Sequence, residues 1–156
     1  MGLFENMNAE PVSSLNLRDP VLVTPKEKVR DVARAMRDRA LGCAILIDEN
    51  NKPAGMFTES MLTQIISSNP SALDERVSAH AAENWPQVTL SDPISTVLDA
   101  LEIKNVHFLS VVDDEGRIAG LAGQKGLMEY VADHFPRQVM VQRVGQKPCM
   151  VAREGA

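Results

Sequence analysis

The sequence contains one pattern twice, and this duplication limits the folds that the chain can adopt. Residues 12–62 align with residues 77–127 without a gap, and ten of the 51 paired positions are identical. The identical pairs include Asp48 with Asp113, which are 65 residues apart. A fixed period of this kind indicates a duplicated structural unit. Each copy is too small to enclose a core alone, so we expect the two copies to share one.

Each copy begins with an extended segment that leads into a helix. The extended segments are residues 21–25 and 86–90, and apolar residues then recur at helical spacing in both copies. Asp92 followed by Pro93 predicts the N-cap and the first turn of the second copy's helix. The first half of each copy is therefore predicted to be a β-α unit.

A β-hairpin and another helix are predicted to complete each copy. Two short apolar runs are joined by a polar turn, and Asn51 and Gly116 share the position at which we expect a positive φ. Thr58 is the predicted cap of the helix that follows the first hairpin. The polar stretch 67–76 contains an Asn-Pro break and predicts a linker. The predicted apolar faces of the last helices consist of Met61, Leu62, Ile65 and Ile66 in copy one, and of Leu127, Met128 and Val131 in copy two.

The expected fold class is α+β. Two β-α-β-β-α repeats, each with one apolar sheet face, are expected to pack about a pseudo-two-fold axis with sheets inward and helices outward. The last helices have more apolar surface than one small core needs, so we also expect a homodimer built across them.

Composition and charge exclude several classes of protein. The chain has 44% hydrophobic residues and a formal charge of −5, which disfavours nucleic-acid binding as its main task. No apolar run approaches the ~18 residues of a membrane helix, and we expect a cytoplasmic protein. Cys43 and Cys149 lack the spacing of a metal site and are expected to be reduced thiols.

The order of these motifs resembles the tandem cystathionine-β-synthase (CBS) domain family, also called the Bateman module, over roughly residues 12–132. The resemblance rests on "VTP" before a helix, on the hairpins "ILIDENNKPAG" and "SVVDDEGRIAG", and on the helix opening "FTESML". It implies a CBS-domain pair that regulates a separate, unknown effector protein and often dimerises. It also implies two clefts for an adenosine compound such as AMP, ADP, ATP or S-adenosylmethionine, with no cofactor or metal required.

We divide the chain on this basis into an N-terminal segment (1–11), CBS repeat 1 (12–72), CBS repeat 2 (73–136) and a basic tail (137–156). The tail shows no clean helical period. We expect it to be irregular and to dock through its cations on the acidic module, in the same chain or in the dimer partner.

The resemblance assigns candidate ligand contacts to the start of each last helix. Family members typically have Ser or Thr there, and three residues later an Asp that holds the ribose hydroxyls. This chain has Thr58 and Met61 in copy one, and Gly123 and Gly126 in copy two. A thioether or a hydrogen cannot replace the charge-assisted bonds of that carboxylate, so we expect weak ribose recognition.

Other candidates lie on the strands and beside the second helix. By this resemblance, His107 matches the position at which some family members place a phosphate-contacting His or Arg, and Lys125 falls where many members have an Arg beside the missing Asp. We expect the copy-two cleft to hold a nucleotide weakly and the copy-one cleft to be drier and empty. Strand residues that line the family's clefts correspond here to Thr24, Ile45, Val88, Thr89 and Ser110.

Each candidate also has a structural interpretation. His107 is compatible with a core-edge histidine, Lys125 with a solvated lysine, Met61 with a core residue, and the two glycines with a loosened helix start. Two functions therefore remain open: a sensor of adenosine compounds, and a structural dimerisation or interaction module with ligand-free clefts. We expect no enzyme, because neither a nucleophile with a base nor a cluster of histidines is evident.

Overall fold

The computed structural model describes residues 2–134, which form two three-stranded sheets and the helices around them. The basic tail and Cys149 lie outside the described residues. The first repeat contains β1 (Leu22–Val23), α2 (Val29–Asp38), β2 (Cys43–Ile47), β3 (Pro53–Thr58) and α3 (Glu59–Ser68). The second contains β4 (Gln87–Thr89), α4 (Ile94–Ile103), β5 (Phe108–Val112), β6 (Ile118–Gly123) and α5 (Gln124–His134). Before the repeats lie α1 (Leu3–Ala9) and the 3-10 helix η1 (Val12–Ser14), and between them lie η2 (Pro70–Asp74) and η3 (Val77–Ala79).

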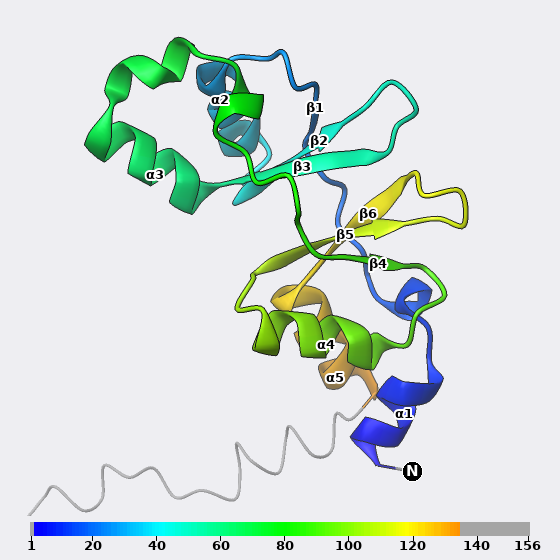
Figure 1. The fold of residues 1–156 in the computed structure, drawn as a ribbon. Coiled ribbons are helices and arrows are strands. Elements are labelled where there is room, and N and C mark those ends of the chain that lie inside the picture. The colour runs from blue at the N-terminus through cyan, green and yellow to red at the C-terminus, as the bar shows by residue number, and fades with distance from the viewer. Residues whose placement is uncertain (1, 135–156) are drawn as a thin grey trace, which may run out of the picture.

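The two sheets have the same topology and register. In each sheet the first strand pairs in parallel with the second, and the second pairs antiparallel with the third. The register shifts after Leu46 in the first hairpin and after its equivalent Val111 in the second. Figure 1 shows the sheets in the middle of the molecule, with α2 and α3 on one side and α4 and α5 on the other. The predicted fold, with sheets inward and helices outward, is confirmed.

The segment that precedes each repeat packs on the other repeat. The Val12 N–H donates to the carbonyl oxygen of Asp92, and the Val77 N–H donates to that of Glu27, both at 2.8 Å. The side chain of Val12 is buried in the core of the second repeat, and that of Val77 in the core of the first. Helix α1, which also precedes the first repeat, packs on the second repeat, since it lies beside α4 (Figure 1). Each core is therefore completed by chain from outside its own repeat.

We call this crossed packing of the leading segments the exchange. It changes one detail of the sequence prediction. Helix α4 begins at Ile94 with Pro93 as its N-cap, so the prediction that Asp92 caps the helix was wrong. The Ile94 N–H instead donates to the carbonyl oxygen of Glu10, in the exchanged segment. The Asp92 carboxylate accepts from the Thr89 N–H at 2.8 Å and closes the preceding turn.

The last helices contribute fewer side chains to the cores than their sequences suggest. Ile65 and Leu127 are buried, whereas Ile66 is 52% and Met128 is 72% exposed. Tyr130, which the sequence analysis did not include, is buried in the second core. The predicted linker is structured, because the end of α3 and all of η2 lie in it and Ala72 is buried.

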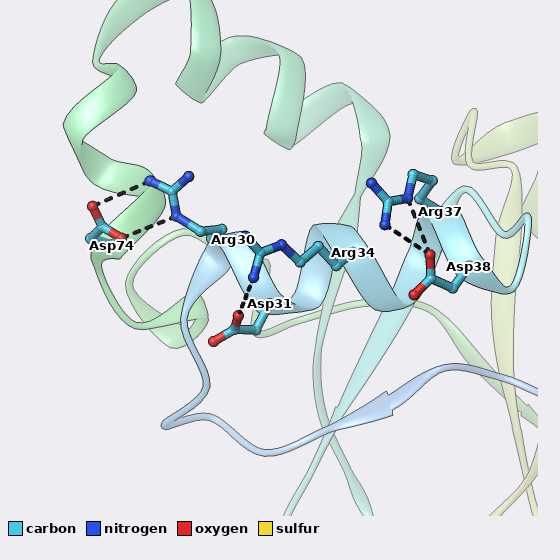
Figure 2. Close-up of polar contacts among 6 residues, drawn as sticks. All are labelled: Arg30, Asp31, Arg34, Arg37, Asp38 and Asp74. Atoms are coloured by element: carbon cyan, nitrogen blue, oxygen red, sulfur yellow. Dashed lines mark hydrogen bonds and ion pairs between the residues drawn. The ribbon is translucent and has the colours of Figure 1, made fainter.

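Ion pairs cover the outer face of α2. Figure 2 shows Arg30 reaching Asp74 of η2 with two nitrogens, at 3.2 and 3.4 Å. The hydrogen bond and the charge of this guanidinium lower the pKa of the Asp74 carboxyl. Arg37 pairs with its neighbour Asp38 further along the helix. Among the helices of residues 2–134, none combines the length and apolar character needed to cross a membrane.

Candidate ligand-binding site

A cavity of about 990 Å³ lies between the two repeats, at the starts of α3 and α5. Both helices start directly after a hairpin strand, so the duplicated topology brings their N-termini to the same place. Helix N-termini present unpaired N–H groups and the positive end of the helix dipole. The cavity is therefore suited to polar or anionic groups of a ligand. Six of the sequence-predicted candidates line it: Thr58, Met61, His107, Gly123, Lys125 and Gly126.

The resemblance implied two clefts, whereas the structure places both helix starts on one cavity. Thr58 and Gly123 are equivalent positions in the two repeats, as are Met61 and Gly126. The expectation that the copy-two cleft holds a nucleotide weakly and that the copy-one cleft is drier and empty stays a prediction. A ligand in the cavity can contact both repeats at once.

The other five candidates do not line this cavity. Ile45 and Ser110 lie in the middle strands of their sheets and are 0% and 3% exposed. Val88 is buried in the second core. Thr24 lies immediately after β1 and Thr89 at the end of β4, and neither lines the cavity.

In the first repeat, backbone contacts fix the start of α3. The Thr58 hydroxyl accepts from the Met61 N–H at 3.4 Å, which confirms the predicted cap. The Glu59 N–H donates to the carbonyl oxygen of Gly42 at 3.0 Å. Glu59 also lines the cavity, and its carboxylate oxygen Oε2 would lie 3.4 Å from a Cβ on Gly42. A carboxylate is therefore present near the site, although not at the position that the family pattern uses.

In the second repeat, the start of α5 requires a glycine. A Cβ on Gly123 would lie 2.9 Å from the backbone oxygen of His107, which is closer than real contacts allow. This close approach explains why the second repeat cannot keep the Thr of the first. His107 and Gly123 both line the cavity.

Ala40 and Asn105, at equivalent positions after α2 and α4, also line the cavity. Both have a φ of 49°, a left-handed conformation that is costly for alanine. Each directly follows the C-cap residue of its helix, a position at which helices commonly end in a left-handed residue, so the same ending stops α2 and α4 beside the cavity.

Several lining residues were missed by the sequence analysis. They include Asn16 and Arg18 from the segment before the first repeat and Trp85 from the segment before the second. The Trp85 indole N–H donates to the carbonyl oxygen of Phe108 at 2.8 Å, which ties that segment to β5. The sequence gives no signal for these residues, because their position depends on how the leading segments cross between the repeats.

Cys43 lies beside the cavity but is not a reactive thiol. It is 1% exposed, and burial raises the pKa of its thiol to about 12, although the nearby Arg18 partly opposes that shift. The thiol is therefore protonated at neutral pH and is a poor nucleophile. In residues 2–134, no group of three His, Cys, Asp or Glu side chains is placed to hold a metal ion.

Comparisons with known proteins agree with this architecture. An uncharacterized protein of Methanopyrus kandleri is 25% identical over 126 residues, which cover 79% of this chain but only 63% of that protein. The solved CBS domain pair of protein MJ0100, in complex with 5′-methylthioadenosine and S-adenosyl-L-methionine, superposes with a TM-score of 0.71. It is 15% identical, and the match covers 80% of this chain and 98% of that one.

A CBS domain protein from Pyrobaculum aerophilum, solved in complex with AMP, has a TM-score of 0.69 and 20% identity. The match covers 79% of this chain and 99% of that one. The family model of the CBS domain matches residues 12–68 and again residues 80–133. With two such matches over most of its length and the paired fold described above, the chain belongs to the CBS domain family.

Proposed function

We propose that this protein is a regulatory CBS-domain pair that binds an adenosine compound in the cavity between its repeats and modulates a separate partner protein. The observation that carries the proposal is the cavity itself. Its volume of about 990 Å³ lies at the upper end of the range of small-molecule sites. Binding there would act on both repeats, which is what a sensor requires.

The residues around the cavity support an adenosine ligand. Trp85 and Phe108 offer aromatic surface for a purine, and Arg18, His107 and Lys125 offer donors for anionic groups. The solved relatives with the same fold were crystallised with AMP, or with S-adenosyl-L-methionine and 5′-methylthioadenosine. No step of this proposal is catalytic.

A structural module remains the second candidate. The specific observation in its favour is that Met61 and Gly126 both line the cavity in place of a carboxylate. A module of this kind would use its exposed surface and leave the cavity without a ligand.

We further propose that two copies associate through α3 and α5. Ile66 and Met128 are large apolar side chains that remain exposed on these helices. Exposed apolar groups at such sites favour contact with another protein surface, and a second copy of this chain is the occupant that we propose.

Titration calorimetry with AMP, ADP, ATP and S-adenosylmethionine tests the proposed function. We expect at least one compound to bind, and we expect His107→Ala to weaken it because His107 lines the cavity. His80→Ala is the matched control, since His80 pairs with Glu75 and lies outside this cavity. Absence of binding heat with all four compounds, together with an unchanged melting temperature, would favour the structural module.

A further inference from the structure

A second cavity of about 320 Å³ adjoins the first, and we call it the side pocket. Asn16, Arg18, Lys125 and Gly126 line both cavities and form the border between them. Asp19 and Arg39 line only the side pocket. A ligand held in the main cavity can therefore extend a second group across this border.

Three cations face the side pocket. The Arg39 side chain donates from Nη2 to the carbonyl oxygen of Asp19 at 3.5 Å, which holds the guanidinium at the rim. Lys125 Nζ lies 3.9 Å from a carboxylate oxygen of Glu129, a loose pair on an exposed side chain. Arg18 forms no ion pair with another residue in 2–134. Donors for a carboxylate or a phosphate are thus available.

Two carboxylates line the same pocket. Glu129 accepts from Asn16 Nδ2 at 3.0 Å and lies next to Lys125, so it is already engaged. Asp19 is exposed and makes no side-chain hydrogen bond or ion pair within the described part of the chain. The side pocket therefore presents an acceptor for a cation beside its donors for an anion.

The charge pattern discriminates between ligand classes. A polyphosphate would place several negative charges beside Asp19 and Glu129 in the side pocket and near Glu59 in the main cavity. The phosphate charges and these carboxylate charges would repel one another. An α-amino-acid head group carries one carboxylate and one ammonium, and both find partners of opposite charge here.

We propose that the side pocket binds the α-amino-acid head group of an adenosyl ligand whose nucleoside occupies the main cavity. This inference rests on the proposed function. The ligand carboxylate pairs with Arg18 and Arg39, and its ammonium pairs with Asp19. A sulfonium between the two parts of the ligand is accommodated by the main cavity, whose aromatic side chains Trp85 and Phe108 and carboxylate Glu59 attract a cation.

Calorimetry with S-adenosylhomocysteine and 5′-methylthioadenosine isolates the head group. Both are adenosine derivatives whose sulfur is an uncharged thioether, and only the first carries the zwitterionic amino-acid head group. We expect S-adenosylhomocysteine to bind at least about tenfold more tightly, because charge-assisted contacts of this kind are worth a factor of ten or more. S-adenosylmethionine tests the added sulfonium, and ATP tests a polyphosphate.

Variants of the side pocket then assign the contacts. Arg39→Ala and Asp19→Asn should each reduce the ratio of the two affinities toward one while leaving 5′-methylthioadenosine binding unchanged. Arg37→Ala is the matched control, because Arg37 lies two residues away on the same helix end, pairs with Asp38 and lines neither cavity. These positions are exposed, and melting temperatures verify that each variant is folded.

The outcomes separate the two proposals. Equal affinities for the two thioethers, or a ratio that Arg39→Ala does not change, overturn the side-pocket assignment and leave the proposed function intact. Tighter binding of ATP that depends on Arg39 also overturns it, in favour of a phosphate pocket. Absence of binding by all four of these compounds overturns the side-pocket assignment, and absence of binding by AMP and ADP as well overturns both proposals.

Discussion

Asn51 and Gly116 occupy equivalent turn positions in the two hairpins, and both adopt a left-handed backbone, with φ values of 63° and 78°. The Asn51 carbonyl oxygen also accepts a 2.9 Å hydrogen bond from the Ile118 N–H, just beyond the other turn. The two hairpin tips therefore contact each other and are conformationally matched. Only glycine and asparagine adopt this backbone region readily, which explains the substitution between the repeats.

Gly116→Ala should destabilise the protein by about 1–2 kcal/mol, because a Cβ at positive φ meets the adjoining carbonyl. Gly116→Asn reproduces the residue of the first repeat and should cost less than Gly116→Ala. Urea unfolding measures both changes. Equal losses for the two variants would show that side-chain bulk, and not backbone conformation, sets the preference at this turn.

The exchange of leading segments predicts that two equivalent valines, Val12 and Val77, each stabilise the core of the other repeat. Val12 and Val77 are each 0% exposed, yet each lies in the core of the repeat opposite to its own. Val12→Ala and Val77→Ala should each lower the free energy of unfolding by about 1.5–3 kcal/mol. Ser13→Ala and Ser78→Ala are the controls, since these neighbours are exposed. A loss no larger than that of the serine variants would contradict the exchange.

The sequence predicts the elements well because their signals are local. Apolar periodicity identifies the helices, and the Asn51 and Gly116 pair identifies the turns. The exchange is not predictable, since Val12 and Val77 repeat at the same offset whether each packs on its own copy or on the other. For the same reason the sequence does not predict that Arg18 and Trp85 line the cavity, because both lie in the exchanged segments. The family pattern pointed to His107 and Lys125, which line the cavity because they lie just before β5 and just after β6.

Cys43 predicts an alkaline loss of stability. Its thiol pKa is raised to about 12 in the folded chain from an ordinary value of 9.0, mainly by burial. Above pH 9 the unfolded chain loses this proton while the folded chain keeps it, so unfolding becomes more favourable as pH rises. The free energy of unfolding should fall between pH 8 and pH 10, by at most about 1.4 kcal/mol per pH unit.

Cys43→Ala should make the free energy of unfolding depend less on pH in this range. Cys149 is present in both the wild type and the variant, so it does not contribute to the difference between them. The range ends at pH 10 because burial raises the pKa of Tyr130 to about 12, so that tyrosine contributes above its ordinary value of 10.0. Urea titrations at three or more pH values supply the measurement. A slope that persists in Cys43→Ala would assign the alkaline effect to another group.

The proposed association of two copies predicts the effect of charge on α3 and α5. Ile66→Glu combined with Met128→Glu should convert the dimer to a monomer, because burying a carboxylate without a partner in an apolar interface is strongly unfavourable. Light scattering at micromolar concentration measures the mass. Ile103→Glu is the control, since Ile103 is 80% exposed on α4 and lies outside the proposed interface. A wild-type chain that is already monomeric would contradict the proposal.

Met61 gives the sharpest test of ribose recognition, because it occupies the third position of α3 and lines the cavity. Met61→Asp restores a carboxylate where the family pattern has one, and the helix N-terminus favours that charge. A charge-assisted bond to the ribose hydroxyls is worth ~1.5–3 kcal/mol, so AMP should bind about tenfold more tightly or better. Met61→Asn, with the same shape and no charge, should gain less, and 2′-deoxy-AMP should lose most of the gain. If Met61→Asp and Met61→Asn bind AMP equally, the ribose does not lie beside α3, and adenosine is held in another part of the cavity.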